Sequence, residues 1–270
     1  AGCDARFNAR QTWLRTGSPD QNEITAQYQS EFYGKDLLDT STIDYGDFTS
    51  TADQTDVPRE AQLVLSGTLI RQEIYGVDET ASAGIPYSVT ENNHIARLVQ
   101  PKADNPYASL QIRPKETLNY HYERRPEDAL IKHEVALRFD QFGHVMQSAS
   151  ITYPRNPDYV DALDKNGEQS KVRCHSQTTL YYNLTKAATQ IDSDLSSDEV
   201  YLLGIPYDHR SYHIANLSEL LGSLDYNAIY AYGDLQKTLA ASVPSQTQIP
   251  FASKVQYTLR SWEKDEYYYP

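Results

Sequence analysis

Long apolar runs, basic residues and cysteines are all scarce in this 270-residue sequence. No apolar run approaches the roughly 20 residues that a membrane-spanning helix needs, so we expect no direct membrane insertion. The first ten residues also lack the apolar core of a signal peptide. The chain carries 24 basic and 37 acidic residues, a net charge of −13, and the basic residues are scattered among acids. Because nucleic-acid binding needs a basic stripe, we expect no nucleic-acid partner.

Metal-binding and redox motifs are missing as well. The two cysteines, Cys3 and Cys174, can form at most one bridge, which is far from the dense disulfide framework of a small secreted domain. The seven histidines are spread singly, without a His-Glu-x-x-His or Cys-x-x-Cys pattern. The sequence therefore predicts no metal and no cofactor.

Tyrosine is the residue type in excess, with 22 tyrosines against six phenylalanines and one methionine. Tyrosine suits half-buried pleated surfaces that have a wet rim. Hydrophobic residues make up 39% of the chain, which is enough to bury a core in a protein of this length. The composition favours a globular protein built on sheets with one dry and one wet face.

Short strand patterns separated by turn residues fill residues 63–153. The first predicted strand spans Leu63–Tyr75 and the second spans Tyr87–Gln100. Two further strands, Leu110–Ile112 and Leu118–Tyr122, flank a break at Arg113–Lys115. This spacing is typical of an antiparallel meander.

A hairpin follows these strands, because apolar residues alternate on both sides of a four-residue turn, 140–143. We expect Asp140 to fold its side chain onto the turn backbone and Gly143 to supply a positive φ before the next strand. The alternation places four residues in the structural core: Leu137, Phe139, Val145 and Ile151.

The second half of the sequence predicts more strands and a few helical turns. Residues 154–171 and 190–199 are polar and are expected to be exposed loops. Strands are expected from Val172 towards Leu184, at 200–203, at 207–214 and in the tail 253–269. One helix is expected around 217–224, capped by Asn216 or Ser218, and a second at 232–241. The expected fold is therefore all-β, mainly antiparallel, with one or two short helices near residues 217–241.

Catalytic arrangements are poorly supported by the spacing of the reactive residues. Neighbours such as Cys174 and His175 point to opposite faces of a strand, so they make a poor nucleophile and base pair, and the same applies to Asp208 and His209. Carboxylates at Glu127–Asp128, Asp140 and 263–266 could do glycosidase-type chemistry only if folding brought two together. Acidic turns are common, so we predict no catalytic residues.

An ordered series of motifs runs from about residue 9 to residue 262 and resembles one known family. The motifs are Thr12–Gly17, Glu31–Asp36, Gly67–Tyr75, Pro86–Glu91, Arg113–Leu118, Tyr120–Arg124, Phe139–Gly143 and Ile205–Asp208. In this order they resemble the B component of the insecticidal Tc toxin complexes, whose relatives include the N-terminal part of the SpvB proteins.

This resemblance implies a non-catalytic segment of the RHS/YD-repeat shell, a hollow β-structure that, with the C component, encloses and delivers a toxic effector. It implies that residues 1–60 lead into the shell and that residues 61–270 belong to it. The implied partners are the remainder of the parent B component, the C component with its effector and, indirectly, the pore-forming A component. The implied location is extracellular, as part of a secreted toxin complex.

Two other functional classes stay open at this point. The abundance of tyrosine would also serve a carbohydrate- or receptor-binding β-module on a bacterial surface. An enzyme is the other alternative, either a glycosidase or an ADP-ribosyltransferase like the separate C-terminal domain of SpvB. The sequence contains no convincing Arg, Ser-Thr-Ser and Glu-x-Glu series for the latter.

Overall fold

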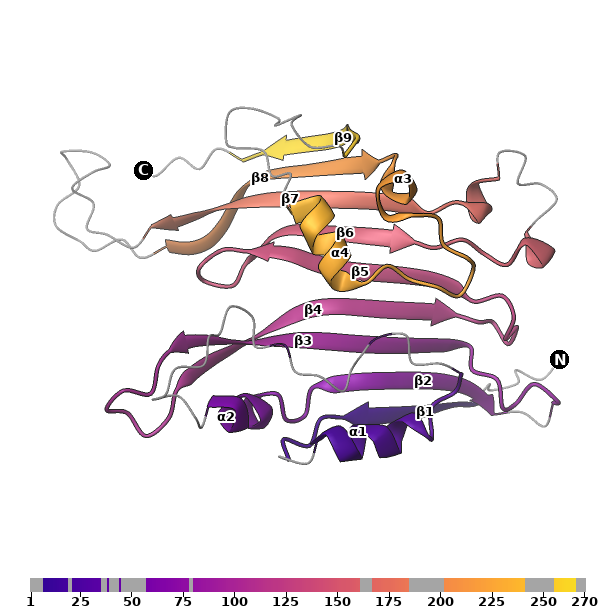
Figure 1. The fold of residues 1–270 in the computed structure, drawn as a ribbon, viewed down its shortest axis with the longest axis horizontal. Helices are drawn as coiled ribbons and strands as arrows, with labels where there is room; N and C mark the ends of the chain where they lie inside the picture. Colours follow the sequence, from indigo (N-terminus) through magenta and orange to yellow (C-terminus); the bar gives the residue numbers. More distant parts are fainter. Residues whose placement is uncertain are drawn as a thin grey trace. The chain divides into compact units, whose positions relative to one another are not determined.

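The computed structural model describes residues 7–18, 21–34, 38, 44, 57–77, 80–160, 167–184, 202–240 and 255–265. These residues form a nine-stranded sheet in which the strand order follows the chain order (Figure 1). Antiparallel pairing, the predicted class, is confirmed. The strands are β1 (Phe7–Leu14), β2 (Leu69–Val77), β3 (Ser88–Gln100), β4 (Ser109–His121), β5 (Leu130–Phe139), β6 (Val145–Thr152), β7 (Arg173–Leu184), β8 (Leu202–Ile214) and β9 (Tyr257–Lys264).

The described helices are short. The two that the sequence predicts are present as α3 (Leu217–Leu221) and α4 (Tyr232–Leu239). Asn216 occupies the N-cap position of α3, but its side-chain oxygen accepts a hydrogen bond from the Gln256 backbone nitrogen (2.8 Å) and does not cap the helix. The other helices are α1 (Gln21–Gln29), α2 (Val57–Val64), η2 (Pro157–Tyr159) and η3 (Glu168–Ser170).

The chain divides into two compact units, the first comprising residues 1–135, 151–172 and 223–229. Its core is built from side chains that successive strands of the sheet contribute. Four aliphatic residues there are at most 1% exposed, one from each of the strands β2 to β5: Ile70, Val89, Leu118 and Ile131.

Helix α2 corrects the prediction that a strand begins at Leu63. Ala61 and Leu65 lie four residues apart, so in a helix they share a face, and both are buried against Ala96 of β3. Gly67 then adopts a φ of +80°, a conformation that costs glycine little. The chain turns there and β2 begins at Leu69. Packing against β3 therefore stabilises a helix here, although the local residues favour a strand.

A continuous strand β4 replaces the break that was predicted at Arg113–Lys115. Pro114 pairs with His94, and the register shifts between Asn93 and His94, so one residue of β4 is accommodated in a bulge. A bulge is one of the few places where a sheet tolerates proline, which has no N–H to donate. The prediction was wrong because it treated the proline as a terminator.

Strand β8 is likewise continuous, although two separate strands were predicted around residues 204–206. The pairing register with β7 shifts between Leu180 and Tyr181 and again between Tyr182 and Leu184, so β7 stays paired with this irregular stretch of β8. Gly204 has a φ of +71°, which the strand accommodates beside these shifts. The ladder between β7 and β8 therefore extends from Leu184 to Cys174.

The predicted hairpin is present as β5 and β6. The Asp140 backbone nitrogen donates to the His144 carbonyl (3.0 Å) and closes the turn. Of the four predicted core residues, Leu137 and Ile151 are 1% and 0% exposed, whereas Phe139 and Val145 are only half-buried beside the turn.

The second unit comprises residues 136–150, 173–222 and 230–270, and α4 lies on its sheet (Figure 1). The Tyr232 hydroxyl donates to the Ala136 carbonyl (2.8 Å), and the Gln236 side chain donates to the Leu137 carbonyl (3.3 Å). Leu235 and Leu239 of α4 are completely buried. Helix α4 therefore supplies the apolar cover for this part of the sheet.

Some predictions fall outside the described residues. They concern Cys3, the acidic loop 190–199, the interior of the loop 154–171 at residues 161–166, and the ends of the predicted tail strand at 253–254 and 266–269.

Replacing Leu137 by aspartate tests the core assignment. A carboxylate at this fully buried position has no partner and leaves an apolar gap, so we expect Leu137→Asp to lose about 3–5 kcal/mol of unfolding free energy or to fail to fold. Leu130→Asp is a matched control on the same strand, because Leu130 is 37% exposed. It should change the unfolding free energy by less than about 1 kcal/mol. Urea unfolding followed by circular dichroism measures both, and equal midpoints would contradict the assignment.

Candidate functional site

Three charged side chains are buried next to one another in the first unit. Arg71, Glu73 and Glu91 are 1%, 0% and 0% exposed. Arg71 and Glu73 are two residues apart in β2, so they point to the same face of the sheet. The register of β2 and β3 places Glu91 directly opposite Arg71. The sheet itself therefore assembles the cluster.

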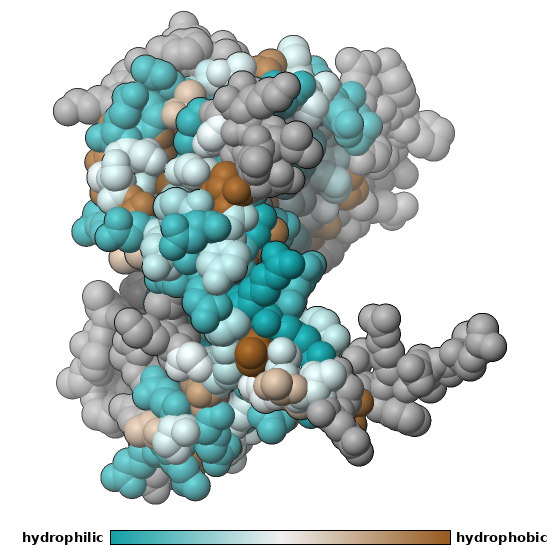
Figure 2. Space-filling model, turned by 90° about the vertical axis from the view of Figure 1, so that its right-hand side faces the viewer, coloured by the Kyte–Doolittle hydropathy of each residue, from teal (hydrophilic) through white to brown (hydrophobic). Residues whose placement is uncertain are grey.

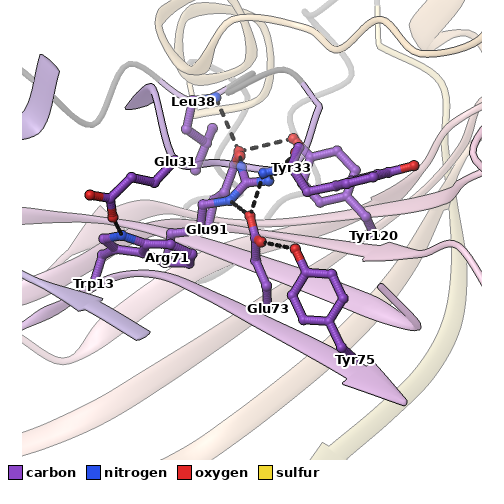
Figure 3. Close-up of polar contacts among 9 residues, drawn as sticks. All are labelled: Trp13, Glu31, Tyr33, Leu38, Arg71, Glu73, Tyr75, Glu91 and Tyr120. Atoms are coloured by element: carbon purple, nitrogen blue, oxygen red, sulfur yellow. Dashed lines mark hydrogen bonds and ion pairs between the residues drawn. The ribbon is translucent and has the colours of Figure 1, made fainter. Parts of the chain in front are cut away.

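Arg71 binds both carboxylates (Figure 3). Its Nε donates to Glu73 Oε1 at 2.6 Å, and its Nη1 donates to Glu91 Oε1. Its Nη2 donates to the backbone carbonyl of Tyr33 at 2.6 Å. The guanidinium also lies over the ring of Phe32, 4.6 Å from the centroid. Every side of this buried cation is therefore in contact with an electron-rich group.

Neutral donors compensate the remaining negative charge of the two carboxylates. The hydroxyls of Tyr75 and Tyr120 donate to Glu73 and Glu91, the latter at 2.9 Å. Burial, reinforced by the negative charge of Glu91, raises the pKa of Tyr120 far above its usual value, so its hydroxyl stays a donor. Burial raises the pKa of the neighbouring Tyr122 to about 12.

The cluster holds the backbone of Tyr33 and of Leu38 against the sheet. The backbone nitrogen of Tyr33 donates to Glu73 Oε1 (2.9 Å), and that of Leu38 donates to Glu91 Oε2 (3.3 Å). Farther out, the Trp13 indole nitrogen donates to Glu31 Oε2 (2.9 Å). Because Arg71 and both cluster carboxylates are at most 1% exposed, no substrate can reach them in this conformation. The arrangement fits a fastening role, in which the cluster attaches the backbone at Tyr33 and Leu38 to the sheet, and does not fit an active site.

A second polar cluster surrounds the predicted turn residue Asp140 in the second unit. Its Oδ1 accepts from the backbone nitrogens of Phe142 (2.9 Å) and His144 (2.8 Å). Its Oδ2 accepts from His144 Nδ1 and from the Asn183 side chain, both at 2.8 Å. Gly143 has a φ of +100°. The Asp140 carboxylate thus joins the hairpin turn to β7.

Hydrogen bonding outweighs burial at this carboxylate. Burial alone raises the pKa of Asp140, but hydrogen bonds from the side chain and backbone of His144 and from Asn183 lower it below its ordinary value. Asn183 also accepts from the Gly204 backbone nitrogen (2.9 Å). A Cβ atom at Gly204 would stand 2.3 Å from His144 Nε2, so the imidazole packs directly on the glycine.

A buried histidine completes the polar interior of the first unit. His133 is 0% exposed, and its Nδ1 and Nε2 lie 3.0 Å from the Tyr153 hydroxyl and 3.1 Å from Glu116 Oε2. The Asn93 side chain donates to the other oxygen of Glu116 (3.1 Å). The imidazole of His133 and the carboxylate of Glu116 both bind other protein groups, as buried polar groups generally do.

Among the described residues, the neighbouring pairs Cys174–His175 and Asp208–His209 do not form catalytic arrangements. Cys174 is fully buried, whereas His175 is exposed, as expected for neighbours in a strand. Burial raises the pKa of the Cys174 thiol to about 12, which leaves it protonated and unreactive at neutral pH. Asp208 binds Arg210 (2.7 Å), while His209 contacts Thr179 (3.0 Å). The two neighbours therefore serve different partners.

The described residues form neither a metal-binding group nor a membrane-spanning helix. Within the described ranges, no group of three or more His, Cys, Asp or Glu side chains could hold a metal ion, and no helix there is long and apolar enough to span a membrane. On the face drawn in Figure 2, hydrophobic side chains occur singly or in small groups among hydrophilic ones. Scattered apolar residues of this kind are ordinary on a protein surface.

The sequence analysis missed the cluster around Arg71, although a signal was present. Ile70 is completely buried, so β2 is covered on one face, and the opposite face carries charged residues at 71 and 73. Alternation alone assigns such a face to solvent. Only the contacts with Tyr33 and Leu38, far away in sequence, reveal that both faces are covered.

A family model described as the insecticide toxin TcdB middle/C-terminal region matches residues 60–205. No curated protein matches the chain.

Solved structures share the fold. A Photorhabdus luminescens Tc holotoxin pore with a mutation in TccC3 superimposes with a TM-score of 0.64 and 22% identity, covering 95% of this chain and 12% of the solved chain. A complex of TcdB2, TccC3 and Cdc42 gives a TM-score of 0.59 and 24% identity over 82% of this chain and 11% of that one. A TcdB2-TccC3-TEV structure gives a TM-score of 0.57 and 25% identity, covering 83% of this chain and 11% of the solved chain. The chain thus spans about one eighth of the solved chain with the highest of these TM-scores.

Removing the buried cation should destabilise the protein strongly. Arg71→Met leaves two buried carboxylates without a counter-charge, so we expect a loss of about 3–5 kcal/mol of unfolding free energy in urea titrations. Adding Glu91→Gln should recover part of this loss because it removes one uncompensated charge. Lys132→Met is the control, since the Lys132–Glu134 pair is 46% and 51% exposed and should change stability by no more than about 1 kcal/mol. Equal losses for Arg71→Met and Lys132→Met would disprove the fastening role.

The Asp140 carboxylate should make the unfolding free energy depend on pH in the acidic range. Its pKa in the folded protein lies below the ordinary value of 3.8, so its stabilisation is complete above that value and is lost as the pH falls through the lower, folded-state pKa. The wild type should therefore exceed Asp140→Asn in unfolding free energy at pH 5, and the difference should shrink towards pH 3. Urea titrations at pH 3, 4 and 5 measure the difference. A difference that is the same at both ends would refute this account.

Proposed function

Because this chain belongs to the family of the insecticide toxin TcdB middle/C-terminal region, we propose that it forms part of the wall of a hollow β-shell that encloses a toxic effector. The chain is a structural component of an insecticidal toxin complex, and its contribution to containment and delivery is mechanical. The enclosing role follows from the kind of sheet that the chain builds.

The strand order is the observation that carries this proposal. Each described strand neighbours the next strand in sequence, from β1 to β9, and the strands are 8 to 13 residues long. A meander of this kind extends sideways one strand at a time and satisfies its backbone hydrogen bonds as it grows. Within the described residues, β1 and β9 each pair with a single strand. Their free edges suit further strands of the parent shell.

The polar interior supports a non-catalytic role. The clusters around Arg71 and His133 are buried and their charged groups bind one another, so they add rigidity and offer no reactive group to a substrate. A containing wall needs this property, because it must keep its shape while holding another protein. We also propose that residues 1–60 lead into the shell and that residues 61–270 belong to it. In support, β1 pairs with β2 across that boundary.

The proposed partners follow from the solved relatives. TcdB2 is seen in complexes with TccC3, and a Tc holotoxin pore also contains TccC3. We propose that the parent of this chain likewise associates with a C component and its effector, meets the pore-forming A component only indirectly, and works outside the bacterial cell as part of a secreted complex.

Cryo-electron microscopy of the parent protein, produced together with its C component, tests the proposal. We expect residues 69–139 and 173–214 to form strands of a closed wall around internal density. A separate compact domain outside any shell, with a polar cleft open to solvent, would reject the wall and favour a carbohydrate- or receptor-binding module.

Protease protection provides a functional check on the same complex. The effector should resist added protease in the wild type and in Leu130→Asp, and should be degraded when Leu137→Asp disrupts the sheet. If the effector still resists protease when Leu137→Asp has unfolded this segment, the segment does not enclose the effector.

A further inference from the structure

Two histidines face each other across neighbouring strands of the second unit. The register of β7 and β8 places His175 directly opposite His213. Their ring centroids are 5.3 Å apart, with the ring planes inclined at 45°. Directly opposed residues have Cβ atoms about 4.5–5.5 Å apart, so the backbone holds both imidazoles on one face of the sheet.

One nitrogen of this pair is buried and lacks a hydrogen-bonding partner among the described residues. His133, His144 and His209 each have a side-chain partner at 3.1 Å or less. In contrast, the Nδ1 atoms of His213 and His94 are buried and have no hydrogen-bonding partner among the described residues. Of these two, His213 has a second histidine opposite it, whereas His94 faces Pro114. A buried polar atom of this kind calls for a water molecule or an ion. His175 is exposed, so solvent has access to the pair.

We propose that His175 and His213 form a two-imidazole site for a divalent transition-metal ion that clips β7 to β8. Imidazole nitrogens bind such ions at about 2.0–2.1 Å, which sets the centroids of two rings on one tetrahedral ion about 5 Å apart. The observed separation is 5.3 Å. The χ2 torsion of histidine is broad, so each ring can turn a nitrogen towards the ion without moving the backbone.

Charge and ligand type determine which ions fit. Arg173 and Arg260 lie near enough to His175 to act on it electrostatically. The same arginines disfavour hard ions that bind mainly through charge. Imidazole ligands suit Cu²⁺, Ni²⁺ and Zn²⁺, and the affinities should follow the order Cu²⁺ above Ni²⁺ and Zn²⁺, with Mn²⁺ far weaker. Water molecules complete the coordination shell.

Calorimetric titration of the full chain with CuCl₂ and NiCl₂, combined with Cu²⁺ electron paramagnetic resonance, tests the site. We expect one ion per chain and a spectrum with two equatorial nitrogens. Because the two rings act together, His175→Gln and His213→Gln should each weaken binding about tenfold or more, and the double variant should be little worse than either. His209→Gln, on the same strand as His213, should retain the wild-type affinity.

Several results would overturn the site. Unchanged affinity in His175→Gln or His213→Gln, a spectrum with a single nitrogen, or a stepwise loss in which each variant removes a separate ion would show adventitious binding at independent histidines. Glutamine keeps a polar side chain at each position, so we expect both variants to fold. Circular dichroism of each variant checks this. The metal site and the shell role are separate, because loss of metal binding leaves the wall seen by cryo-electron microscopy unchanged.

Discussion

A buried guanidinium must be neutralised, and much of the first unit is arranged around this requirement. Arg71 lies at the centre of a sheet face where water cannot solvate it, so two carboxylates, one backbone carbonyl and one aromatic ring surround it. The two carboxylates then need donors of their own, which come from tyrosine hydroxyls and from the backbone at Tyr33 and Leu38. The backbone at Tyr33 and Leu38 is therefore held in place by the charged groups that β2 and β3 bury.

Tyrosine suits this arrangement better than phenylalanine would. Tyr120 packs an apolar ring beside that of Tyr122, with centroids 6.0 Å apart, while its hydroxyl reaches Glu91. One side chain thus fills space and satisfies a buried carboxylate. The excess of tyrosine in the sequence is consistent with an interior that is packed and polar together.

Local patterns predicted most of the strands but not the irregular positions. Alternation located the hairpin of β5 and β6, the strand β7 and the two short helices near the end, because each buries one face in a regular period. It failed at Pro114 and Pro206, where bulges let a strand continue past a residue that usually ends one. It failed also at α2, where Ala61 and Leu65 pack on β3. Bulges and packing depend on partner strands, which local sequence does not specify.

The polar clusters depend even more on distant partners. Asp140 and Gly143 could be assigned to a turn because every group in that turn is close in sequence. The Arg71 cluster and the facing histidines could not, because each needs the register between two strands. Cys174 and His175 illustrate the difference, since their adjacency indicated opposite faces but gave no sign that His213 would lie across from the imidazole.

The close approach of Gly204 to His144 constrains how the family can diverge. Any side chain at 204 would collide with the imidazole, and a smaller residue at 144 would leave Asp140 without one of its donors. Neither position can change alone, although one lies on β8 and the other in the turn before β6, sixty residues apart. Accepted changes at the two positions should therefore be correlated among homologues, so this glycine and histidine would be inherited as one unit.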